Sequence, residues 1–289
     1  MSDVESATVT RHRKAGRFFH AAGVESFVRE AGEGVPVVCM HGVPASCFLY
    51  RKVIAEFAER GMRGVAFDLP GLGLAERPTT FDYTWTGLGR FSLAAVNALE
   101  LERFHLVVHD IGGPVGFELA ALASGRIASL TVLNTIVEVD SFRRPWSMEP
   151  FARRGIGEAY LRAMSKPAFR ILMRMQGIAD MNAVRREELD AYVELLKRAD
   201  GGAAFLQIMR GFERTAEKRH LYESVLGDPA YPRQIVWGAK DPVLKVAVHG
   251  EIARRAARVD RIYALRAKHF LQEDQAAAVA EHVAQLAQR

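Results

Sequence analysis

Asp110 stands where a sequence would place a reactive side chain. It ends a Val-rich segment and is followed within two residues by a pair of glycines, in Phe104–Gly116 (FHLVVHDIGGPVG). A strand that turns sharply into a helix is typical of a nucleophile elbow, whose crowded turn needs small neighbours such as Gly112 and Gly113. Val108 is larger than the glycine of the serine version, and an aspartate can also cap a helix. We nevertheless expect Asp110 to be a nucleophile, because two other segments support it.

The first of these segments is His41–Ser46 (HGVPAS), which follows the apolar run PVVCM. A loop at the carboxyl end of a strand near the elbow can offer a backbone N–H to a developing oxyanion. The N–H of Val43 and that of Ile111 would together form such an oxyanion hole. Backbone donors do not depend on the side chain, so valine and isoleucine are compatible with this role.

The second supporting segment lies towards the carboxyl terminus. Asp241 follows an apolar run in IVWGAKDPVL, and His269 comes 28 residues later in AKHFLQED. With Asp110, the chain order is nucleophile, acid, base, which is the order found in α/β-hydrolases. Glu138 and Asp140 follow another predicted strand and are the rival acids. We favour Asp241 as the acid that orients His269.

Short apolar runs alternate with helical patterns along most of the chain, which indicates a sheet covered by helices. Several runs are continuous in Val, Ile and Leu, as expected for parallel strands buried on both faces. The predicted fold class is therefore α/β, with a mostly parallel eight-stranded sheet. The predicted strands are Arg17–Ala21, Val24–Arg29, Val35–His41, Arg63–Asp68, His105–Asp110, Leu130–Thr135, Gln234–Trp237 and Arg261–Leu265. The predicted helices are Tyr50–Arg60, Trp85–Leu99, Gly113–Ala123, Ala247–Ala257 and Gln275–Ala287.

One stretch breaks this alternation. From about Ser141 to Glu223 the chain shows one helical pattern after another, interrupted by prolines and glycines, and no convincing strand. We interpret this stretch as a helical cap inserted between two strands of a single domain. The predicted division is a first part of the core at 1–140, the cap at 141–225 and a second part of the core at 226–289.

The composition excludes several classes of protein. The chain has 289 residues, of which 49% are hydrophobic and 25% charged, as is ordinary for globular proteins. No apolar run reaches the roughly 20 residues of a membrane helix, and the amino terminus lacks the apolar stretch of a secretory signal. Cys39 and Cys47 form neither a disulfide framework nor a metal-ligand spacing. We therefore expect a cytoplasmic protein without a metal.

The net charge of +5 is unevenly distributed. Residues 142–219 contain 16 Lys and Arg against 10 Asp and Glu, so this stretch carries +6 and the rest of the chain about −1. A solvated helical surface explains this excess, and an anionic substrate or partner is the alternative that stays open. Nucleic-acid binding would need a denser basic stripe with aromatic residues, and the sequence contains none.

Outside the predicted cap, the chain resembles the haloalkane dehalogenase and epoxide hydrolase branch of the α/β-hydrolases. The segments that carry this resemblance are HGVPASCFLYRKVI, FDLPGLGLAERP, FDYTW, LVVHDIGGPVG, LTVLNT, WGAKDPVL and HFLQED. FLYRKV, YTW and HFLQED look most like dehalogenases that take their acid from the loop that holds Asp241. His109, directly before the nucleophile, looks more like epoxide hydrolases.

The resemblance implies hydrolysis through a covalent ester. A carboxylate nucleophile displaces a leaving group at saturated carbon, which leaves an ester on Asp110. Water activated by His269 and oriented through Asp241 then attacks that ester, and the oxyanion faces the N–H groups of Val43 and Ile111. Such an enzyme needs a small organic substrate and water, but no cofactor, nucleic acid or membrane. A homodimer is left open.

The chain departs from the dehalogenase pattern at two positions. Dehalogenases usually have Trp after the nucleophile and often Asn in the HGxP loop, where this chain has Ile111 and Val43. Isoleucine and valine side chains cannot donate to a departing halide, and an unpaired buried anion is costly. An indole or hydroxyl from the cap could take over, as donor to a halide or as acid for an epoxide. The candidates are Trp146, Tyr160, Tyr192 and Tyr222.

Two substrate classes therefore stay open, carbon–halogen compounds and epoxides. The overall similarity favours a dehalogenase-like enzyme, and the missing halide donors favour an epoxide hydrolase. A non-catalytic ligand-binding protein on the same fold is the alternative of another class. It is disfavoured because all three positions of the predicted triad are filled.

Overall fold

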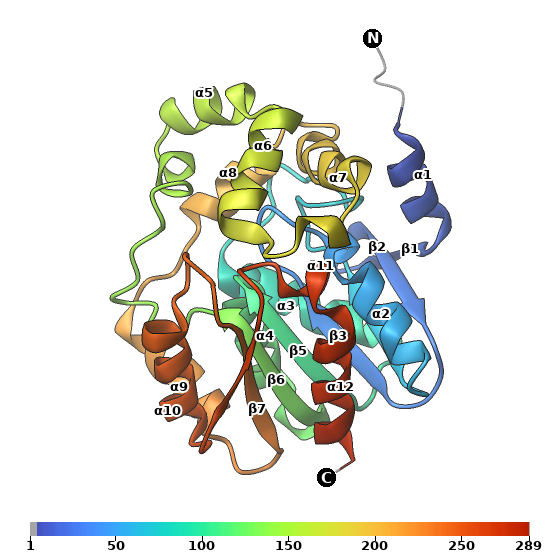
Figure 1. Cartoon of the computed structure of the whole chain (residues 1–289), viewed down its shortest axis with the longest axis vertical. Coiled ribbons are helices and arrows are strands. Elements are labelled where there is room, and N and C mark those ends of the chain that lie inside the picture. The colour runs from blue at the N-terminus through green and yellow to red at the C-terminus, as the bar shows by residue number, and fades with distance from the viewer. Residues whose placement is uncertain (1–4, 289) are drawn as a thin grey trace.

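Eight strands form one sheet in the computed structural model, which describes residues 5–288 (Figure 1). Their order across the sheet is β1-β2-β4-β3-β5-β6-β7-β8. β1 pairs antiparallel with β2, and β2 with β4, whereas all pairings among β3 to β8 are parallel. This sheet confirms the predicted fold class. The strands are β1 (Arg17–Ala21), β2 (Val24–Ala31), β3 (Pro36–Met40), β4 (Arg63–Phe67), β5 (Phe104–Asp110), β6 (Ile127–Thr135), β7 (Arg233–Gly238) and β8 (Ile262–Leu265).

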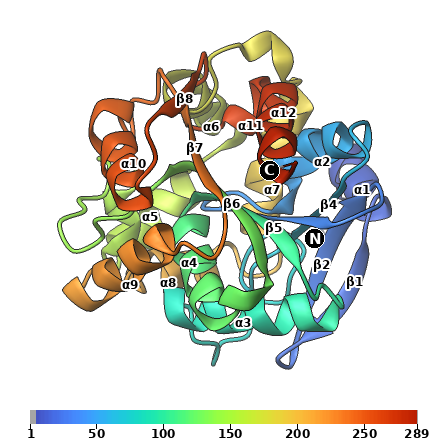
Figure 2. The same cartoon turned by 90° about the horizontal axis from the view of Figure 1, so that it is seen from below.

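Helices cover both faces of the sheet (Figure 2). One face is covered by α2 and α12, and the other by α3, α4, α9 and α10. The central strands β3, β5 and β6 are buried along almost their whole length, as their continuous apolar sequences predict. Within residues 5–288, none of the helices combines the length and the apolar character needed to cross a membrane. The covering helices are α2 (Arg51–Ala58), α3 (Trp85–Ala98), α4 (Gly112–Leu122), α9 (Ala216–Gly227), α10 (Glu251–Ala257) and α12 (Ala276–Ala287).

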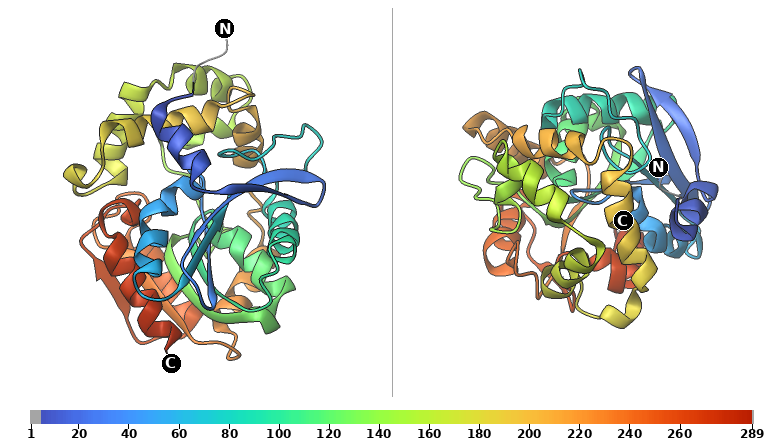
Figure 3. Two further views of the ribbon diagram at one scale, coloured as in Figure 1. Left: turned by 90° about the vertical axis from the view of Figure 1, so that its right-hand side faces the viewer. Right: turned by 90° about the horizontal axis from the view of Figure 1, so that it is seen from above.

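Four further helices lie together above the end of the sheet at which the parallel strands finish (Figures 1 and 3). They form the cap, and the carboxyl ends of the parallel strands point towards them. The loops that follow these strands therefore meet beneath the cap, which is where open α/β sheets place their sites. The cap helices are α5 (Ile156–Ala163), α6 (Lys166–Leu172), α7 (Arg186–Lys197) and α8 (Ala203–Arg210), and a short wide-turned helix, Met173–Gly177, continues α6.

The predicted end of the cap at residue 225 falls within α9. α9 packs against α4 and α10 at the flank of the sheet, so the helices that lie over the site end before it. Figure 2 shows α9 beside α10 and away from the cap helices α6 and α7. The sequence pattern could not place this boundary, because an amphipathic helix of the cap and one of the core have the same periodicity.

The amino-terminal helix α1 (Ala7–Lys14) was not predicted. It packs against α7 of the cap (Figure 1). The side chain of Ser6 caps it by accepting a hydrogen bond from the N–H of Val9. Only Thr8, Val9 and His12 are buried in this helix, so its sequence carries little apolar periodicity. Packing against the cap, which the sequence does not reveal, is therefore what gives this helix its place.

Candidate active site

The turn between β5 and α4 holds Asp110 in a strained conformation. Its φ is +54°, in the left-handed region that non-glycine residues rarely adopt. Neighbouring glycines allow this turn to be crowded. A Cβ on Gly42 would lie 2.2 Å from Asp110 Oδ1, and one on Gly113 would lie 1.8 Å from Thr135 Oγ1. The hydroxyl of Thr135 donates to the carbonyl of Asp110 at 2.5 Å and fixes the turn from the neighbouring strand.

The carboxylate of Asp110 is held between the HGVP loop and a histidine. Oδ1 accepts a hydrogen bond from the N–H of Val43 at 2.8 Å, and Oδ2 lies 3.4 Å from His269 Nε2. The side chain keeps 16% of its surface exposed. Burial by itself would raise the pKa of Asp110, yet the hydrogen bond and charge of His269, helped by the N–H of Ile111, bring it below its ordinary value. Asp110 is therefore an ionised carboxylate with a reachable oxygen.

His269 is oriented from its other side by Asp241. Nδ1 of His269 lies 2.8 Å from Oδ2 of Asp241, which also accepts a hydrogen bond from Asn134 Nδ2 at 2.6 Å. The N–H groups of Val243 and Leu244 donate to Oδ1. Every oxygen of this buried carboxylate therefore has a donor, which fixes the plane and position of the imidazole.

The protonation of the cluster follows from its two carboxylates. Burial by itself would lower the pKa of His269, but Asp241 and Asp110 raise it to about 10. Burial would also raise the pKa of Asp241, but the charge of His269 keeps it below its ordinary value. At neutral pH the three side chains thus form an imidazolium between two carboxylates, with one negative charge in excess.

Asp110 and His269 both line a cavity between the sheet and the cap. The centre of a water-sized sphere can reach about 70 Å³ of this cavity, which opens to solvent. Most of its lining is apolar, so polar interactions inside it are stronger than in water. The cap contributes the polar side chains Arg144, Ser147 and Gln176. Its apolar walls include Ile136, Phe142, Phe169, Leu172, Met173 and Phe270.

The strand ends of this α/β sheet thus bring together a carboxylate at a strained turn, a histidine and an acid that orients the histidine. A comparison of the sequence with known protein families agrees with this arrangement. Residues 35–276 match the family described as "alpha/beta hydrolase fold". This chain belongs to the α/β-hydrolase family. The matched residues run from the start of β3 to the start of α12, so they span the cap as well as the core.

Among the relatives, an uncharacterized hydrolase of Saccharomyces cerevisiae is 25% identical, with 90% of this chain and 92% of that protein covered. A haloalkane dehalogenase of Mycolicibacterium paratuberculosis is 27% identical, with 87% and 83% covered. The crystal structure of an epoxide hydrolase from Vigna radiata superposes with a TM-score of 0.72 at 20% identity, with 93% and 96% covered. The similarities of this hydrolase thus lie in the dehalogenase and epoxide hydrolase branch.

The rival acids of the hydrolase lie elsewhere. Glu138 and Asp140 face Arg219, at 3.8 and 3.5 Å, on the surface beside α9. Their side chains are 31% and 27% exposed, whereas that of Asp241 is fully buried against His269. The geometry therefore leaves Asp241 as the partner of His269.

His109, which precedes Asp110, supports the histidine loop. Its Nε2 lies 2.8 Å from the carbonyl oxygen of His269, and the two rings are 4.8 Å apart. Burial, followed by the charge of His269, lowers the pKa of His109 to about 4, so its ring is neutral. Because a carbonyl oxygen only accepts, Nε2 carries the proton and donates. His109 thus ties the backbone of His269 to the strand that carries Asp110.

The four aromatic donors predicted in the cap do not line the cavity. Trp146 has 68% of its surface exposed, although its neighbours Pro145 and Ser147 face the cavity. Tyr160 packs against Phe151, with ring centroids 4.9 Å apart. The prediction placed Trp146 and Tyr160 in the segment that forms the cap, but it could not tell which way each side chain points.

The other two predicted tyrosines use their hydroxyls in the protein interior. The hydroxyl of Tyr192 donates to Glu273 at 2.5 Å, and that of Tyr222 donates to Glu118 at 2.9 Å. Both side chains are completely buried, and Tyr222 belongs to α9, which is not part of the cap. Neither hydroxyl is available to a substrate in this arrangement.

One polar residue that lines the cavity carries no recognisable signal in the sequence. Gln176 projects from the short helix Met173–Gly177, and its Oε1 accepts a hydrogen bond from Ser147 Oγ at 2.9 Å. Within residues 5–288 its side-chain NH₂ group has no acceptor. Its backbone oxygen accepts from the N–H of His269 at 3.3 Å, so this residue joins the cap to the histidine loop. No sequence motif marks it.

One group of buried side chains has the types of metal ligands. The ligand atoms of His12, Cys47 and Asp68 lie within 4.8 Å of one another. However, the oxygens of Asp68 accept backbone N–H groups from Cys47 and Leu74, and Arg29 lies 3.5 Å from His12 Nδ1. Burial also raises the pKa of the Cys47 thiol, which opposes the thiolate that a metal requires. We therefore assign no metal to this group.

Proposed function

We propose that this hydrolase cleaves a bond at saturated carbon through an ester on Asp110. The observation that carries this proposal is the carboxylate itself, at the strained turn where other hydrolases place serine, within 3.4 Å of His269. Attack of a carboxylate on an ordinary ester would give an anhydride. Displacement at saturated carbon gives an ester, which water can hydrolyse.

In the first step an oxygen of Asp110 forms a bond to the substrate carbon. The bond from that carbon to a halogen or an epoxide oxygen breaks, and the leaving atom takes the electron pair. The lowered pKa of Asp110 keeps the nucleophile ionised. No base is required, which is consistent with a histidine that is protonated in the resting enzyme.

In the second step water attacks the ester carbonyl of Asp110. Alkylation has removed one of the two negative charges that raise the pKa of His269, so this histidine now loses its proton to solvent more readily. Neutral His269 takes a proton from the water, and the oxyanion faces the N–H groups of Val43 and Ile111. When the intermediate collapses, the alkoxide leaves and takes the proton from His269, and the carboxylic acid formed on Asp110 passes its proton to His269, which restores the carboxylate and the imidazolium.

The leaving group decides between two substrate classes, and the cavity favours halide. The tyrosines that would act as acids for an epoxide have their hydroxyls turned elsewhere, whereas the amide of Gln176 faces the cavity. An amide N–H donates a hydrogen bond to an anion but does not give up its proton. A leaving halide needs only such a hydrogen bond, whereas an alkoxide needs a proton. Epoxide hydrolysis is the second candidate, because Val43 and Ile111 put apolar side chains where dehalogenases place halide donors.

The proposal is tested by trapping the ester. His269→Phe should form it and fail to hydrolyse it, so intact-protein mass spectrometry with 1-bromohexane or 1,2-epoxyhexane should show one adduct. The double variant Asp110→Asn/His269→Phe is the control and should show none. An adduct that persists in the double variant, or no adduct from a substrate that the wild type consumes, would contradict the mechanism. Bromide and diol, assayed separately with the wild type, identify the substrate class.

A further inference from the structure

The cavity contains a buried cation, Arg144, that the proposed chemistry does not use. This residue lies between β6 and α5, where the chain enters the cap. Its side chain is only 7% exposed and lines the same cavity as Asp110 and His269. A guanidinium is charged at any physiological pH, so its burial needs a reason.

The guanidinium of Arg144 is held in place by neutral groups. Nη2 donates to the carbonyl oxygen of Met209 at 2.7 Å, and the guanidinium carbon lies 4.4 Å from the ring centre of Phe212. Met209 and Phe212 also line the cavity. These contacts fix the direction of the side chain, but they do not neutralise its charge.

Among residues 5–288, no carboxylate lies within hydrogen-bond distance of the Arg144 guanidinium. The nearest, Glu149, lies 3.9 Å from Nη1 and is 41% exposed. Within residues 5–288, Nη1 and Nε take part in no hydrogen bond, and Nε is buried. Burial, followed by the charge of Arg214, lowers the pKa of Arg144, and the charge of Glu149 offsets this only in part. By contrast, the buried guanidinium of Arg77 lies 2.9 Å from Asp200.

We propose that Arg144 binds an anionic group of the substrate, a carboxylate remote from the reacting carbon. This inference rests on the proposed function and adds the substrate class. A carboxylate would be repelled near Asp110, so the substrate must place its reacting end there and its anionic end at Arg144. The apolar walls of the cavity suit an alkyl chain. Arginine forms two parallel hydrogen bonds with a carboxylate through adjacent N–H groups, and either Nη1 or Nε can supply one of them beside the second N–H of Nη2.

Matched substrates test this orientation. The pairs are 6-bromohexanoate with 1-bromohexane, and 5,6-epoxyhexanoate with 1,2-epoxyhexane, so that charge changes while the reacting group does not. The wild type should show a higher kcat/KM for the anionic member of the pair that it hydrolyses, by about tenfold or more. A series of ω-bromoalkanoates should show an optimum of chain length, because Arg144 and Asp110 stand at a fixed separation.

Variants assign the preference to one residue. Arg144→Met should lower kcat/KM for the anionic substrate by about 10- to 100-fold and change it for the neutral one by less than about twofold. Arg144→Lys should recover part of the loss, since it keeps the charge but not the paired donors. Arg153→Met is the matched control, because Arg153 lies 3.7 Å from the same Glu149 but is 64% exposed. It should behave as the wild type.

Three results would overturn the inference. The first is equal activity of the wild type on the anionic and the neutral member of a pair. The second is a loss in Arg144→Met that is the same for both members. The third is a loss for the anionic substrate in Arg153→Met that is as large as the loss in Arg144→Met. If neutral 1-bromohexane still gives the ester adduct with His269→Phe, the proposed function stands and only the role of Arg144 fails. Calorimetric titration with hexanoate adds a readout without turnover. The wild type should bind it at least about tenfold more tightly than Arg144→Met, and equal binding would count against the site.

Discussion

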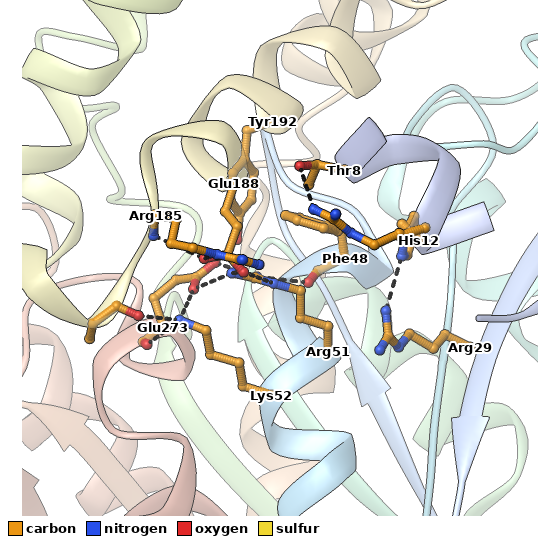
Figure 4. Close-up of polar contacts among 12 residues, drawn as sticks. Thr8, His12, Arg29, Phe48, Arg51, Lys52, Arg185, Glu188, Tyr192 and Glu273 are labelled. Atoms are coloured by element: carbon orange, nitrogen blue, oxygen red, sulfur yellow. Dashed lines mark hydrogen bonds and ion pairs between the residues drawn. The ribbon is translucent and has the colours of Figure 1, made fainter. Parts of the chain in front are cut away.

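Two buried clusters of charged side chains in this hydrolase differ in what they can do. One is formed by Asp110, Asp241 and His269 at the cavity. The other, which we call the Arg51 cluster, consists of Arg51, Lys52, Glu188, Tyr192 and Glu273 (Figure 4). Glu273 follows His269 by only four residues, in HFLQED. Similar groups in one short segment of the chain thus belong to two different environments.

The Arg51 cluster is balanced and saturated. Arg51 donates to both oxygens of Glu273, at 2.6 and 2.8 Å, and its Nε donates to Glu188 at 3.1 Å. Lys52 lies 3.0 Å from Glu273, and the hydroxyl of Tyr192 completes the shell. Two cations face two carboxylates, and none of these residues lines the cavity. In Figure 4 the contacts join α2, α7 and the segment after His269, so the cluster connects the cap to the core.

The site cluster is neither balanced nor closed. It holds two carboxylates and one imidazolium, and the carboxylate of Asp110 faces an apolar cavity. The excess negative charge raises the proton affinity of His269, and the missing donor at the cavity side leaves an oxygen free to attack carbon. The comparison teaches that burial of charge by itself does not make a site. A site also needs a charged or polar group that lacks a partner within the protein and faces a cavity.

Asp110→Asn tests this contrast with the largest expected effect. The amide keeps the shape of the side chain but is a poor nucleophile, so turnover should fall by about 10³-fold or more. The melting temperature should stay close to that of the wild type, because the elbow and its glycines are unchanged. Deamidation must be excluded by mass spectrometry. A variant that keeps most of its activity without deamidation would remove Asp110 from the mechanism.

Glu273→Gln tests the other cluster. It leaves Arg51 and Lys52 buried or half-buried without their main counter-charge, and breaking a buried ion pair costs about 3–5 kcal/mol. Urea titration should show this loss in the free energy of unfolding. Turnover per folded molecule should remain within a few-fold, since Glu273 does not line the cavity. The opposite pattern, unchanged stability with abolished turnover, would show that the two clusters are one functional unit.

The two clusters should also differ in alkaline solution. The folded pKa of His269, about 10, lies above its ordinary value of 6.5, so its contribution to stability is complete below pH 6.5 and is lost as the pH rises towards 10. Burial would lower the pKa of Arg51, but Glu273 raises it, so this cluster keeps its charges over that range. From pH 7 to 9 the unfolding free energy should fall by up to about 1.4 kcal/mol per pH unit. His269→Phe should lack this decline, and an identical slope in that variant would refute the assignment.

Sequence patterns predicted the sheet well because strand burial and strand-end motifs are local signals. The boundaries of β1 agree in full, and the elbow, the acid and the histidine come from residues adjacent to strand ends. The cap was harder, because helical periodicity says which face is apolar but not what that face meets. Trp146 and Tyr192 were therefore assigned to a cavity that they do not reach. Arg144 and Gln176 were missed because an isolated arginine or glutamine in a helical segment is usually solvated.

Tyr192→Phe has the smallest expected effect on the free energy of unfolding, and it tests whether the Arg51 cluster acts on stability alone. The change removes one hydroxyl from the shell of Glu273, while the donors from Arg51 and Lys52 remain. A hydrogen bond to a charged group contributes about 1.5–3 kcal/mol, and we expect the low end because three donors are left. Tyr160→Phe is the matched control, since the hydroxyl of Tyr160 makes no hydrogen bond within residues 5–288, and it should lose little stability.

Neither tyrosine change should alter turnover by more than about twofold, because neither side chain lines the cavity. A tyrosine that acted as the acid for epoxide opening would behave differently, since general acid catalysis contributes about 10²–10⁴-fold. Diol formation from 1,2-epoxyhexane and bromide release from 1-bromohexane should therefore be measured for both variants. A loss of that size in diol formation alone, with bromide release unchanged, would mean that Tyr192 leaves Glu273 and reaches the substrate. The Arg51 cluster would then supply a catalytic residue, and it would not serve only to connect the cap to the core.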